Sequence, residues 1–405
     1  MIIISKPYLK DCGDFSRLIS DIIVNGNVPY ELYYEVKTEY KKYLTYELSD
    51  AFVVTLMLWA MERNEDIMCE APISERLYKQ LTEYLIPAIS KNIKQYSKIK
   101  IIAETANIRF NGDGVGTGLS CGVDSFYTIL KNLNHSEESK LNITHLCYFN
   151  VGASGGDEGD VDNARHIYQE RMKEFEIVAK ELGCNFLTVD SNMNEFLRQP
   201  HEATHVFRTL SVPLALQKLF HLYYFSSSAE YSMFKFVWYD CSFYDLLNMQ
   251  AISNDNLRFE MVGGETTRQG KIEFIDTNKI VQNHLNVCIR GIHNDNTCLK
   301  CKRTILNLYI DGKLDDFRNV FDVDYFYKNK SKFLTFAVKN KKLIDMTEIN
   351  KLLKQKHMLP LHNRIAGNIL RFLRYLYFSF QKFLKSILKI FSIKKTSKKE
   401  NEKNA

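Results

Sequence analysis

The sequence predicts an α/β protein with a doubly wound, mostly parallel sheet. An N-terminal α+β domain precedes this sheet, and a C-terminal amphipathic helix follows it. Three observations predict this class. Strand and helix patterns alternate with short connections over residues 105–312, and such alternation forms right-handed βαβ units with helices on both faces of a parallel sheet. Residues 1–104 hold a separate mixture of strand and helix patterns, and residues 363–405 repeat basic and apolar side chains at helical spacing.

The N-terminal domain is expected to combine strands with buried helices. Residues 30–36 alternate apolar and polar side chains, as a half-buried strand does. Residues 48–64 and 74–93 carry apolar side chains at helical spacing, and Ser74 is a candidate N-cap of the second helix. Residues 97–104 predict a strand that closes the domain.

The central domain carries the alternation of strands and helices. The expected order is strand 115–120, helix 123–133, strand 141–152, helix 160–183 with Gly183 as its C-cap, strand 184–191, helix 204–227 and strand 233–240. Pro213 lies inside the last of these helices and allows a kink or a break there. Residues 313–362 are expected to form a helical extension of this domain.

Composition and charge narrow the class of protein. A hydrophobic fraction of 45% is usual for a chain with ordinary cores. Residues 364–405 hold 11 Lys or Arg and 2 Asp or Glu, a net charge of +9, so the rest of a chain with a total of +6 is slightly acidic at −3. This acidic body predicts no nucleic-acid partner. The cysteines mostly stand alone, and no secretory signal pattern is visible, so we expect a cytoplasmic protein.

The stretch SCGVDS, residues 120–125, lies between a predicted strand and a predicted helix. The free N–H groups of a helix start attract anions, phosphate above all. Gly122 lets the backbone come close to a phosphate, and Ser120 and Ser125 offer hydroxyl donors. Asp124 would repel a phosphate unless Mg²⁺ lies between them, or unless the carboxylate caps the helix. The structural alternative is an ordinary turn with serine and aspartate caps, and the Walker pattern is absent from this stretch.

This stretch resembles the S-G-G-x-D-S loop of the ATP pyrophosphatases, also called the PP-loop or adenine nucleotide alpha hydrolase superfamily. The resemblance covers about residues 105–312, and Cys121 stands where the motif has its first glycine. In that family the loop grips the pyrophosphate end of ATP. An oxygen of the substrate attacks the α-phosphate, and a nitrogen or sulfur nucleophile then displaces AMP. The resemblance therefore implies ATP and Mg²⁺ as cofactors and a small-molecule substrate.

The same resemblance implies roles for particular residues. Those implied to bind ATP are Ser120, Cys121, Gly122, Val123, Asp124 and Ser125. Those implied to be catalytic are Asp124, Ser125, Arg268 and Lys271, the last two matching an R-x-x-K run of similar enzymes. A solvated charged turn is the alternative for that run. The glycine-rich loop 150–160, with Asp157, Glu158 and Asp160, is a candidate lid.

A cysteine cluster follows between residues 284 and 308. Cys298 and Cys301 have the spacing of a zinc knuckle, and Cys288 is close enough to join them. A structural zinc site needs four ligands. The candidates for the fourth are His284, His293, Asp295 and a more distant residue.

The cluster is similar to the cysteine-rich tail of the 7-cyano-7-deazaguanine synthase branch of these enzymes. Relatives carry a Cys-x-x-Cys-x-x-Cys-x-Arg-Thr run, and its end matches Cys298, Cys301 and the pair Arg303–Thr304. Asp295 falls where the first cysteine of the run would be. The resemblance thus implies zinc on Cys288, Asp295, Cys298 and Cys301, and a degenerate site with free thiols is the alternative.

Three functions follow from these features. The leading hypothesis is an AMP-forming ATP pyrophosphatase that adenylates a small-molecule carboxylate or carbonyl for attack by ammonia or an amine. The alternatives are a tRNA sulfur transferase, which reactive Cys298 and Cys301 would favour, and a catalytically inactive nucleotide-binding sensor or scaffold at the membrane surface. The sequence identifies neither the substrate, nor the oligomeric state, nor the role of residues 1–104.

The C-terminal segment predicts a basic amphipathic helix over residues 364–393. Basic positions recur at helical spacing, namely Arg371, Arg374, Lys382, Lys385 and Lys389, and aromatic and aliphatic residues fill the positions between them. Such a helix suits the surface of an anionic membrane at its inner face. Docking on the protein's own body and binding to a partner protein are the alternatives. Residues 393–405 are expected to be disordered.

Overall fold

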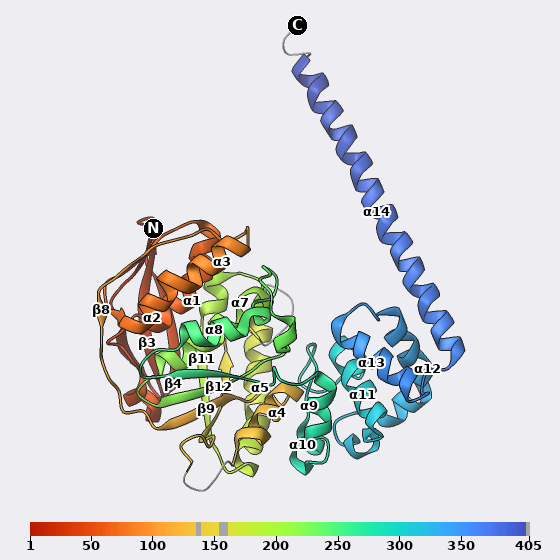
Figure 1. The fold of residues 1–405 in the computed structure, drawn as a ribbon. Helices are drawn as coiled ribbons and strands as arrows, with labels where there is room; N and C mark the ends of the chain where they lie inside the picture. The colour runs from red at the N-terminus through yellow and green to blue at the C-terminus, as the bar shows by residue number, and fades with distance from the viewer. Residues whose placement is uncertain (135–138, 154–160, 402–405) are drawn as a thin grey trace. The chain divides into compact units, whose positions relative to one another are not determined.

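The computed structural model describes residues 1–134, 139–153 and 161–401 (Figure 1). The chain forms two compact units, Met1–Lys300 and Cys301–Ala405. It is an α/β protein whose central sheet is mixed and mostly parallel. The four-part division expected from the sequence stays a prediction, and the boundary between the compact units falls inside the range 105–312.

The first unit is built on one eleven-stranded sheet. Its strands are β1 (Ile2–Ile4), β2 (Tyr8–Cys12), β3 (Phe15–Val24), β4 (Tyr30–Lys37), β5 (Ile67–Cys69), β7 (Ile101–Ile102), β9 (Gly114–Gly118), β10 (His145–Asn150), β11 (Asn185–Ser191), β12 (Phe220–Ser226) and β13 (Arg258–Val262). The order is β13-β12-β9-β10-β11-β4-β3-β1-β5-β7, and β2 pairs with β3. Strands β6 (Ile73–Ser74) and β8 (Thr105–Ala106) form a separate pair.

The sheet joins the N-terminal strands to the central ones. Strands β13 to β11 run parallel to one another. At β11 the direction changes, because β4 pairs with it antiparallel at Asp190↔Glu35 and Ser191↔Tyr34. Residues 1–104 therefore extend the same sheet and share its hydrophobic core.

The helices connect and cover these strands. In the first unit they are α1 (Asp50–Arg63), α2 (Glu75–Gln80), α3 (Ile86–Asn92), α4 (Val123–Asn132), α5 (Val161–Glu181), α6 (Met193–Leu197), α7 (His201–Ala215), α8 (Asp245–Ile252), α9 (Arg268–Ile275) and α10 (Lys279–His284). Helix α11 (Leu299–Asp311) leads into the second unit, which holds α12 (Val323–Lys339), α13 (Ile344–Gln355) and α14 (Leu361–Asn401).

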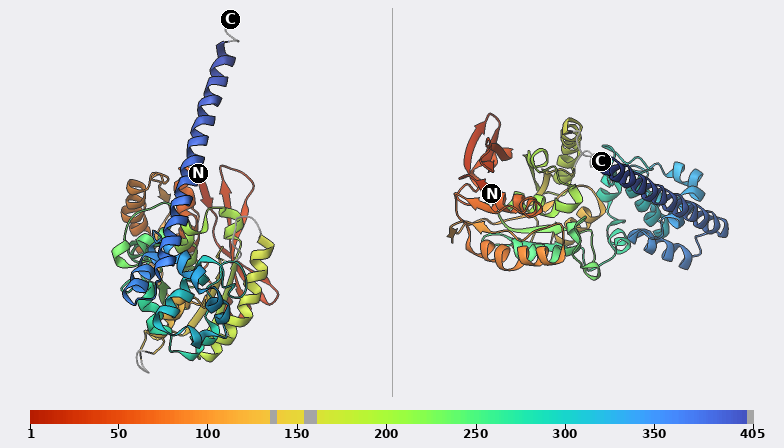
Figure 2. Two further views of the ribbon diagram at one scale, coloured as in Figure 1. Left: turned by 90° about the vertical axis from the view of Figure 1, so that its right-hand side faces the viewer. Right: turned by 90° about the horizontal axis from the view of Figure 1, so that it is seen from above.

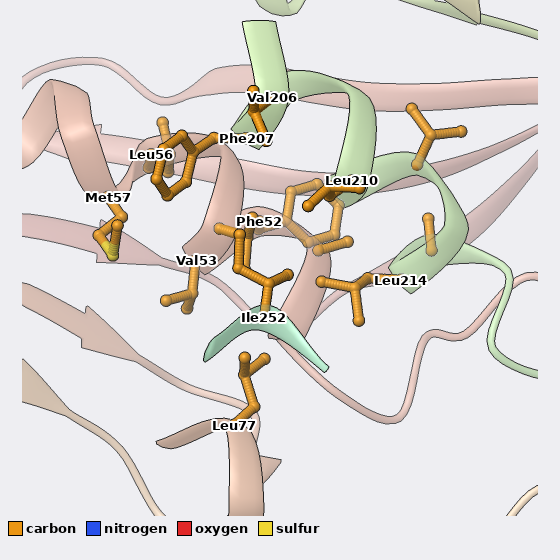
Figure 3. Close-up of a cluster of buried hydrophobic side chains, with 14 of the residues drawn as sticks. Phe52, Val53, Leu56, Met57, Leu77, Val206, Phe207, Leu210, Leu214 and Ile252 are labelled. Carbon is orange, nitrogen blue, oxygen red and sulfur yellow. The ribbon is translucent and has the colours of Figure 1, made fainter. Parts of the chain in front are cut away.

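The core lies between α1 and α7. Figure 3 shows Phe52 and Leu56 of α1 pointing toward Phe207 and Leu210 of α7, with Ile252 of α8 beside them. Burying each such side chain stabilises the fold by about 1.5–3 kcal/mol. Helix α1 is buried on nearly all sides, because the sheet, α6 and α7 lie against it.

A buried carboxylate fixes the start of α1 in this core. Asp50 accepts hydrogen bonds from Gln217 Nε2 at 3.1 Å and from Asn254 Nδ2 at 3.0 Å. It also accepts one from the Ser74 hydroxyl. Burial raises the pKa of Asp50, and these hydrogen bonds oppose that rise. Ser74 stands at the N-cap position of α2, as expected, but its side chain makes no capping hydrogen bond there.

Two sequence expectations are wrong near the end of the sheet. The helix expected over 204–227 ends at Ala215 as α7, and Phe220–Ser226 form strand β12. Strand β12 is central in the sheet and buried on both faces, so it lacks the alternation that marks a half-buried strand. The strand expected over 233–240 is a loop in which Trp238 and Tyr239 are about half exposed. The other expected strands and helices of the first unit are present, although the one expected over 97–104 is only Ile101–Ile102.

The second unit is helical. Helix α14 runs on as one helix in both views of Figure 2, and it continues through residues 393–401, where the sequence predicts disorder. Lysine is a good helix former, which is compatible with this continuation. Among the residues that the structure describes, no helix is both long and apolar enough to cross a bilayer.

Candidate nucleotide loop and metal centre

The loop 119–122 follows β9 at the point where the strand order reverses. From β9 the chain adds β10 and β11 on one side of the sheet and β12 and β13 on the other. Ligands of open α/β sheets bind at such switch points, outside the carboxyl ends of the strands. Helix α4 begins directly after this loop, with Gly122 as its N-cap residue and no side-chain cap. The strand–loop–helix context expected for residues 120–125 is therefore present.

The two serines of the loop hold its shape. Ser125 Oγ donates to Gly118 O at 2.7 Å and accepts from Ser120 N at 3.2 Å. The Ser120 hydroxyl accepts from Gly122 N at 3.3 Å. The hydroxyl proton of Ser125 is thus already used within the loop. A role as phosphate donor, as expected from the sequence, requires it to change partner.

Cys121 occupies a backbone conformation that favours glycine. Its φ is +53°, and its side chain is 1% exposed. Its carbonyl accepts a hydrogen bond from Asn286 N at 2.8 Å. Burial raises the pKa of the Cys121 thiol well above its usual value, so the thiol stays protonated at neutral pH. Glycine, the residue of the S-G-G-x-D-S pattern at this position, adopts this conformation without strain, and the protonated Cys121 thiol adds no activated nucleophile.

Substitutions at position 121 test this backbone requirement. A left-handed conformation costs an L-residue roughly 1–2 kcal/mol. We expect Cys121→Gly to change the free energy of unfolding by less than about 1 kcal/mol, because relief of this strain offsets the lost side chain. We expect Cys121→Val to destabilise by at least about 2 kcal/mol, because a β-branched residue tolerates this conformation worst. Urea unfolding measures both, and equal stabilities of the two variants would contradict the assignment.

Asp124 is held between two basic side chains from α9. Arg268 Nη1 donates to its Oδ2 at 3.1 Å, and Lys271 Nζ donates to its Oδ1 at 2.8 Å. Lys271 Nζ also donates to Ser227 O, at the end of β12, at 2.6 Å. The side chains of Lys271 and Arg268 are 3% and 10% exposed. The R-x-x-K run is therefore no solvated turn, and Asp124 pairs with it instead of capping α4.

Gly263, which follows β13, makes room for Lys271. Gly263 has a φ of +93°, and a Cβ there would lie 2.8 Å from Lys271 Cε. Thr267 caps α9 by accepting from Gly270 N at 3.2 Å, which sets the start of the helix that carries Arg268. The stretch between β13 and α9 thus aims both cations at the loop of β9.

A second ion pair lies next to this site, and the sequence analysis missed it. Glu265 accepts hydrogen bonds from Tyr127 OH at 2.6 Å and from Gly263 N at 3.0 Å, and it pairs with Lys131. Tyr127 and Lys131 are on α4, so Glu265 ties the α9 segment to the helix behind the loop. The spacing of Tyr127 and Lys131, four residues apart on α4, indicates that they share one side of the helix. Nothing in the sequence indicates that Glu265 is their partner.

The pH dependence of stability tests this second pair. Burial tends to raise the pKa of Glu265, but hydrogen bonds from Lys131 and Tyr127 outweigh it and lower this pKa from 4.5 to about 2. A carboxylate with a depressed folded pKa stabilises the protein above its unfolded pKa and loses this effect as pH falls. We therefore expect the melting temperature to fall between pH 4.5 and about 2, and to fall less steeply in Glu265→Gln. Parallel melting curves for both proteins across this window would contradict the pairing.

Four side chains between residues 288 and 301 could hold a metal ion. The ligand atoms of Cys288, Asp295, Cys298 and Cys301 all lie within 4.8 Å of one another. Sulfur atoms around zinc lie about 3.8 Å apart, since each Zn–S bond is about 2.3 Å. The group is therefore near the size of a zinc site. Cys301 follows Cys298 by one turn at the start of α11, so local helix geometry sets their separation.

Asp295 is fixed as the fourth member of this group. Its Oδ1 accepts from Thr297 N and Cys298 N, both at 2.8 Å. Such hydrogen bonds orient a carboxylate that ligates a metal. His293 Nδ1 lies 3.4 Å from Glu174 instead, and its side chain is 76% exposed. The sequence leaves several candidates for the fourth ligand, and the geometry favours Asp295 among them.

His284, the remaining histidine candidate, also lies elsewhere. Its Nε2 is 3.2 Å from a Glu181 carboxylate oxygen on α5. Three of the four grouped residues are buried, and Asp295 is partly exposed. Three cysteines and one carboxylate could supply the four ligands that a structural zinc ion takes.

The metal group and the loop are linked through the backbone. Asn286, two residues before Cys288, donates to the Cys121 carbonyl of the loop. Arg171 of α5 donates to the carbonyls of Cys288 at 2.8 Å and Gly291 at 2.6 Å. The segment that carries the first cysteine therefore braces the candidate phosphate loop. The expectation that the loop 150–160 is a lid stays a prediction, because residues 154–160 lie outside the described residues.

Family models, curated proteins and solved structures were compared with the chain, and none of them matches it.

Proposed function

We propose that this chain is an AMP-forming ATP pyrophosphatase that adenylates a small-molecule carboxylate or carbonyl for attack by ammonia or an amine. The observation that carries the proposal is the meeting of Asp124, Arg268 and Lys271 at the start of α4. This group of three side chains lies at the switch point of the parallel strands. The resemblance to the PP-loop enzymes implies that the pyrophosphate end of ATP binds there. The same position supports the finer fold assignment, an adenine nucleotide alpha hydrolase-like arrangement.

The charges at this site suit a phosphate chain. Two cations face one carboxylate, which leaves a net positive charge beside the N-terminus of α4. The helix end adds its own partial positive charge. Lys271 is almost fully buried, and Coulomb attraction is stronger there than in water. An incoming phosphate would compete with Asp124 for cations that this carboxylate already holds in position.

Asp124 also bears on the expected Mg²⁺ ion. Carboxylate oxygens are the ligands that Mg²⁺ prefers alongside phosphate oxygens. Both oxygens of Asp124 accept hydrogen bonds from cations, so Mg²⁺ would share this carboxylate with Arg268 and Lys271. A bound triphosphate would draw these two side chains toward itself and leave Asp124 to the metal.

The proposed reaction has two steps. A substrate oxygen attacks the α-phosphorus of ATP, the bond to the bridging oxygen of the β-phosphate breaks, and pyrophosphate leaves. The nitrogen nucleophile then forms a bond to the activated carbon and displaces AMP. The contribution of the loop, Arg268 and Lys271 is to hold and neutralise the leaving pyrophosphate, which is catalysis by positioning and electrostatics.

The cysteine group favours a nitrogen nucleophile over sulfur transfer. A sulfur carrier needs an accessible, reactive thiol. Cys298 and Cys301 are 1% and 0% exposed and lie with Cys288 and Asp295 in a group that suits zinc. Modification of Cys298 or Cys301 by a thiol reagent in the folded, zinc-replete protein would instead favour the sulfur transferase.

Nucleotide product analysis tests the proposal. The protein is incubated with Mg-ATP and a small-molecule extract, in parallel with Asp124→Ala and Ser125→Ala. Arg258→Ala is the matched control, because Arg258 is an exposed residue at the start of β13, away from the loop. We expect AMP and pyrophosphate from the wild type and the control only, together with the loss of one metabolite that names the substrate.

Other outcomes would replace the proposal. Production of ADP would show cleavage at the wrong phosphate. AMP formation that persists in both loop variants would place the reaction elsewhere. ATP binding without any turnover in substrate-complete extract would favour the sensor or scaffold at the membrane.

A further inference from the structure

Helix α14 packs against α12 through its polar side. Asn363 Nδ2 donates to the Ser331 carbonyl of α12 at 2.8 Å. One turn later, a Cβ at Gly367 would lie 2.5 Å from Val338 Cβ, so glycine is needed for this close approach. The two helices lie side by side here (Figure 1).

The contact continues on the same side of α14. Arg371 is partly buried, and Arg374 Nη1 donates to Asn340 Oδ1 at 3.0 Å, just beyond the end of α12. With Asn363 and Gly367, these residues follow at intervals of three or four, which keeps them on one side of the helix.

The opposite side of α14 is apolar and exposed. Six apolar side chains recur there at intervals of three or four residues, each with 46% to 66% of its surface exposed, namely Leu361, Ile365, Ile369, Phe372, Leu376 and Phe380. Amphipathic helices usually bury such a stripe against their own protein. This helix does the reverse, because its polar side contacts α12 and its apolar side faces outward.

The apolar side is long and rich in aromatic residues. Residues 361–380 span about 30 Å at 1.5 Å per residue. All residues from 372 to 381 are exposed, and Leu373 and Tyr375 widen the stripe. Single exposed apolar side chains are ordinary, but a continuous surface of this kind marks an interaction site.

Charge identifies the occupant of this surface. Residues 361–399 contain ten Lys or Arg and no Asp or Glu. A second copy of α14 would bring like charges together, whereas helix pairs rely on opposite charges beside their apolar seam. An acidic lipid surface would meet both the basic residues and the apolar stripe.

We propose that α14 is an interfacial helix that lies on an anionic phospholipid surface. Its apolar side enters the boundary between headgroups and acyl chains, and the lysines that follow the contact with α12, namely Lys382, Lys385 and Lys389, meet the headgroup charge. Helix α12 is then carried on the water-facing side, since it contacts the polar side of α14. This surface is independent of the nucleotide loop, so the proposal stands or falls separately from the proposed reaction.

Vesicle sedimentation with the full chain tests this proposal. We compare vesicles of phosphatidylcholine alone with vesicles that also contain phosphatidylserine. The test variant replaces Phe372, Leu376 and Phe380 by Ser, and the matched control replaces the exposed Phe234, Trp238 and Tyr239 of the first unit by Ser. We expect the wild type and the control to bind the anionic vesicles, and the test variant to bind at least about tenfold more weakly.

Several results would overturn the proposal. One is equal binding of the test variant and the wild type, and another is equal binding to both kinds of vesicle. Absence of vesicle binding by the wild type is a third. The fourth result comes from ultracentrifugation without vesicles. Self-association of the wild type that the test variant abolishes would assign the surface to a second copy of the chain. An unchanged melting temperature shows that the test variant is folded.

Discussion

Lys271→Met is expected to weaken ATP binding by about 10- to 100-fold, because a hydrogen bond to a charged group contributes about 1.5–3 kcal/mol. Lys271 Nζ holds Asp124 at 2.8 Å and the Ser227 carbonyl at 2.6 Å, so its loss removes a buried cation and the tie between α9 and β12. Arg268 still pairs with Asp124, which prevents an uncompensated carboxylate. AMP formation should fall at least as far as binding.

Titration calorimetry with Mg-ATP measures this effect. Lys279→Met is the matched control, because Lys279 is exposed on α10 and its ammonium group donates to Gln282. A second variant, Lys271→Arg, keeps the charge and should retain more binding than Lys271→Met. ATP affinity that is the same in Lys271→Met and the wild type would exclude this lysine from the nucleotide site.

Removal of zinc is expected to have the second large effect. Metal analysis of the purified protein should find about one zinc per chain, held by Cys288, Asp295, Cys298 and Cys301. The double variant Cys298→Ser/Cys301→Ser should lose the metal and melt about 10 °C lower or more, since zinc-binding free energy adds to folding free energy. ATP affinity should fall as well, because Asn286 braces the Cys121 carbonyl of the loop.

The control for the zinc experiment is Cys12→Ser/Cys184→Ser, which removes two cysteines outside the group. It should keep both the metal and the melting temperature within a few degrees of the wild type. A wild-type protein without metal that melts at the same temperature with and without a chelator would contradict the site. Loss of metal with unchanged ATP affinity would contradict only the link between the two sites.

The sequence was sufficient for features set by local chain geometry. Residues 115–133 were predicted as strand, loop and helix, because glycine, serine and helical periodicity follow one another within a few residues. Cys298 and Cys301 are predicted to act together, because two cysteines three residues apart have the spacing of a zinc knuckle. These local patterns do not depend on how distant strands pair.

The sequence was insufficient where distant strands meet. Asp124 and Lys271 are 147 residues apart, and they meet because β13 lies beside β12. Neither strand is predicted from the sequence. The buried run of β12 has no alternating pattern and is predicted as a helix, and no strand is predicted over Arg258–Val262 of β13. The partner of Tyr127 and Lys131, Glu265, was missed for the same reason.

The choice of fourth metal ligand was also beyond spacing alone. Asp295 and His293 are two residues apart, and either fits a ligand pattern. Hydrogen bonds from Thr297 N and Cys298 N orient the Asp295 carboxylate toward the three cysteines, whereas His293 lies beside Glu174. Such a difference depends on the local turn, which the sequence pattern did not specify.

Equilibrium binding of Mg-ATP, with pyrophosphate as competitor, tests the central claim most directly. The claim is that the loop 120–125, with Arg268 and Lys271, holds the pyrophosphate end of ATP. We predict that the wild type binds Mg-ATP, that pyrophosphate displaces it, and that Asp124→Ala and Lys271→Met each weaken both ligands together. Binding that pyrophosphate leaves intact, or that both variants retain in full, would contradict the account.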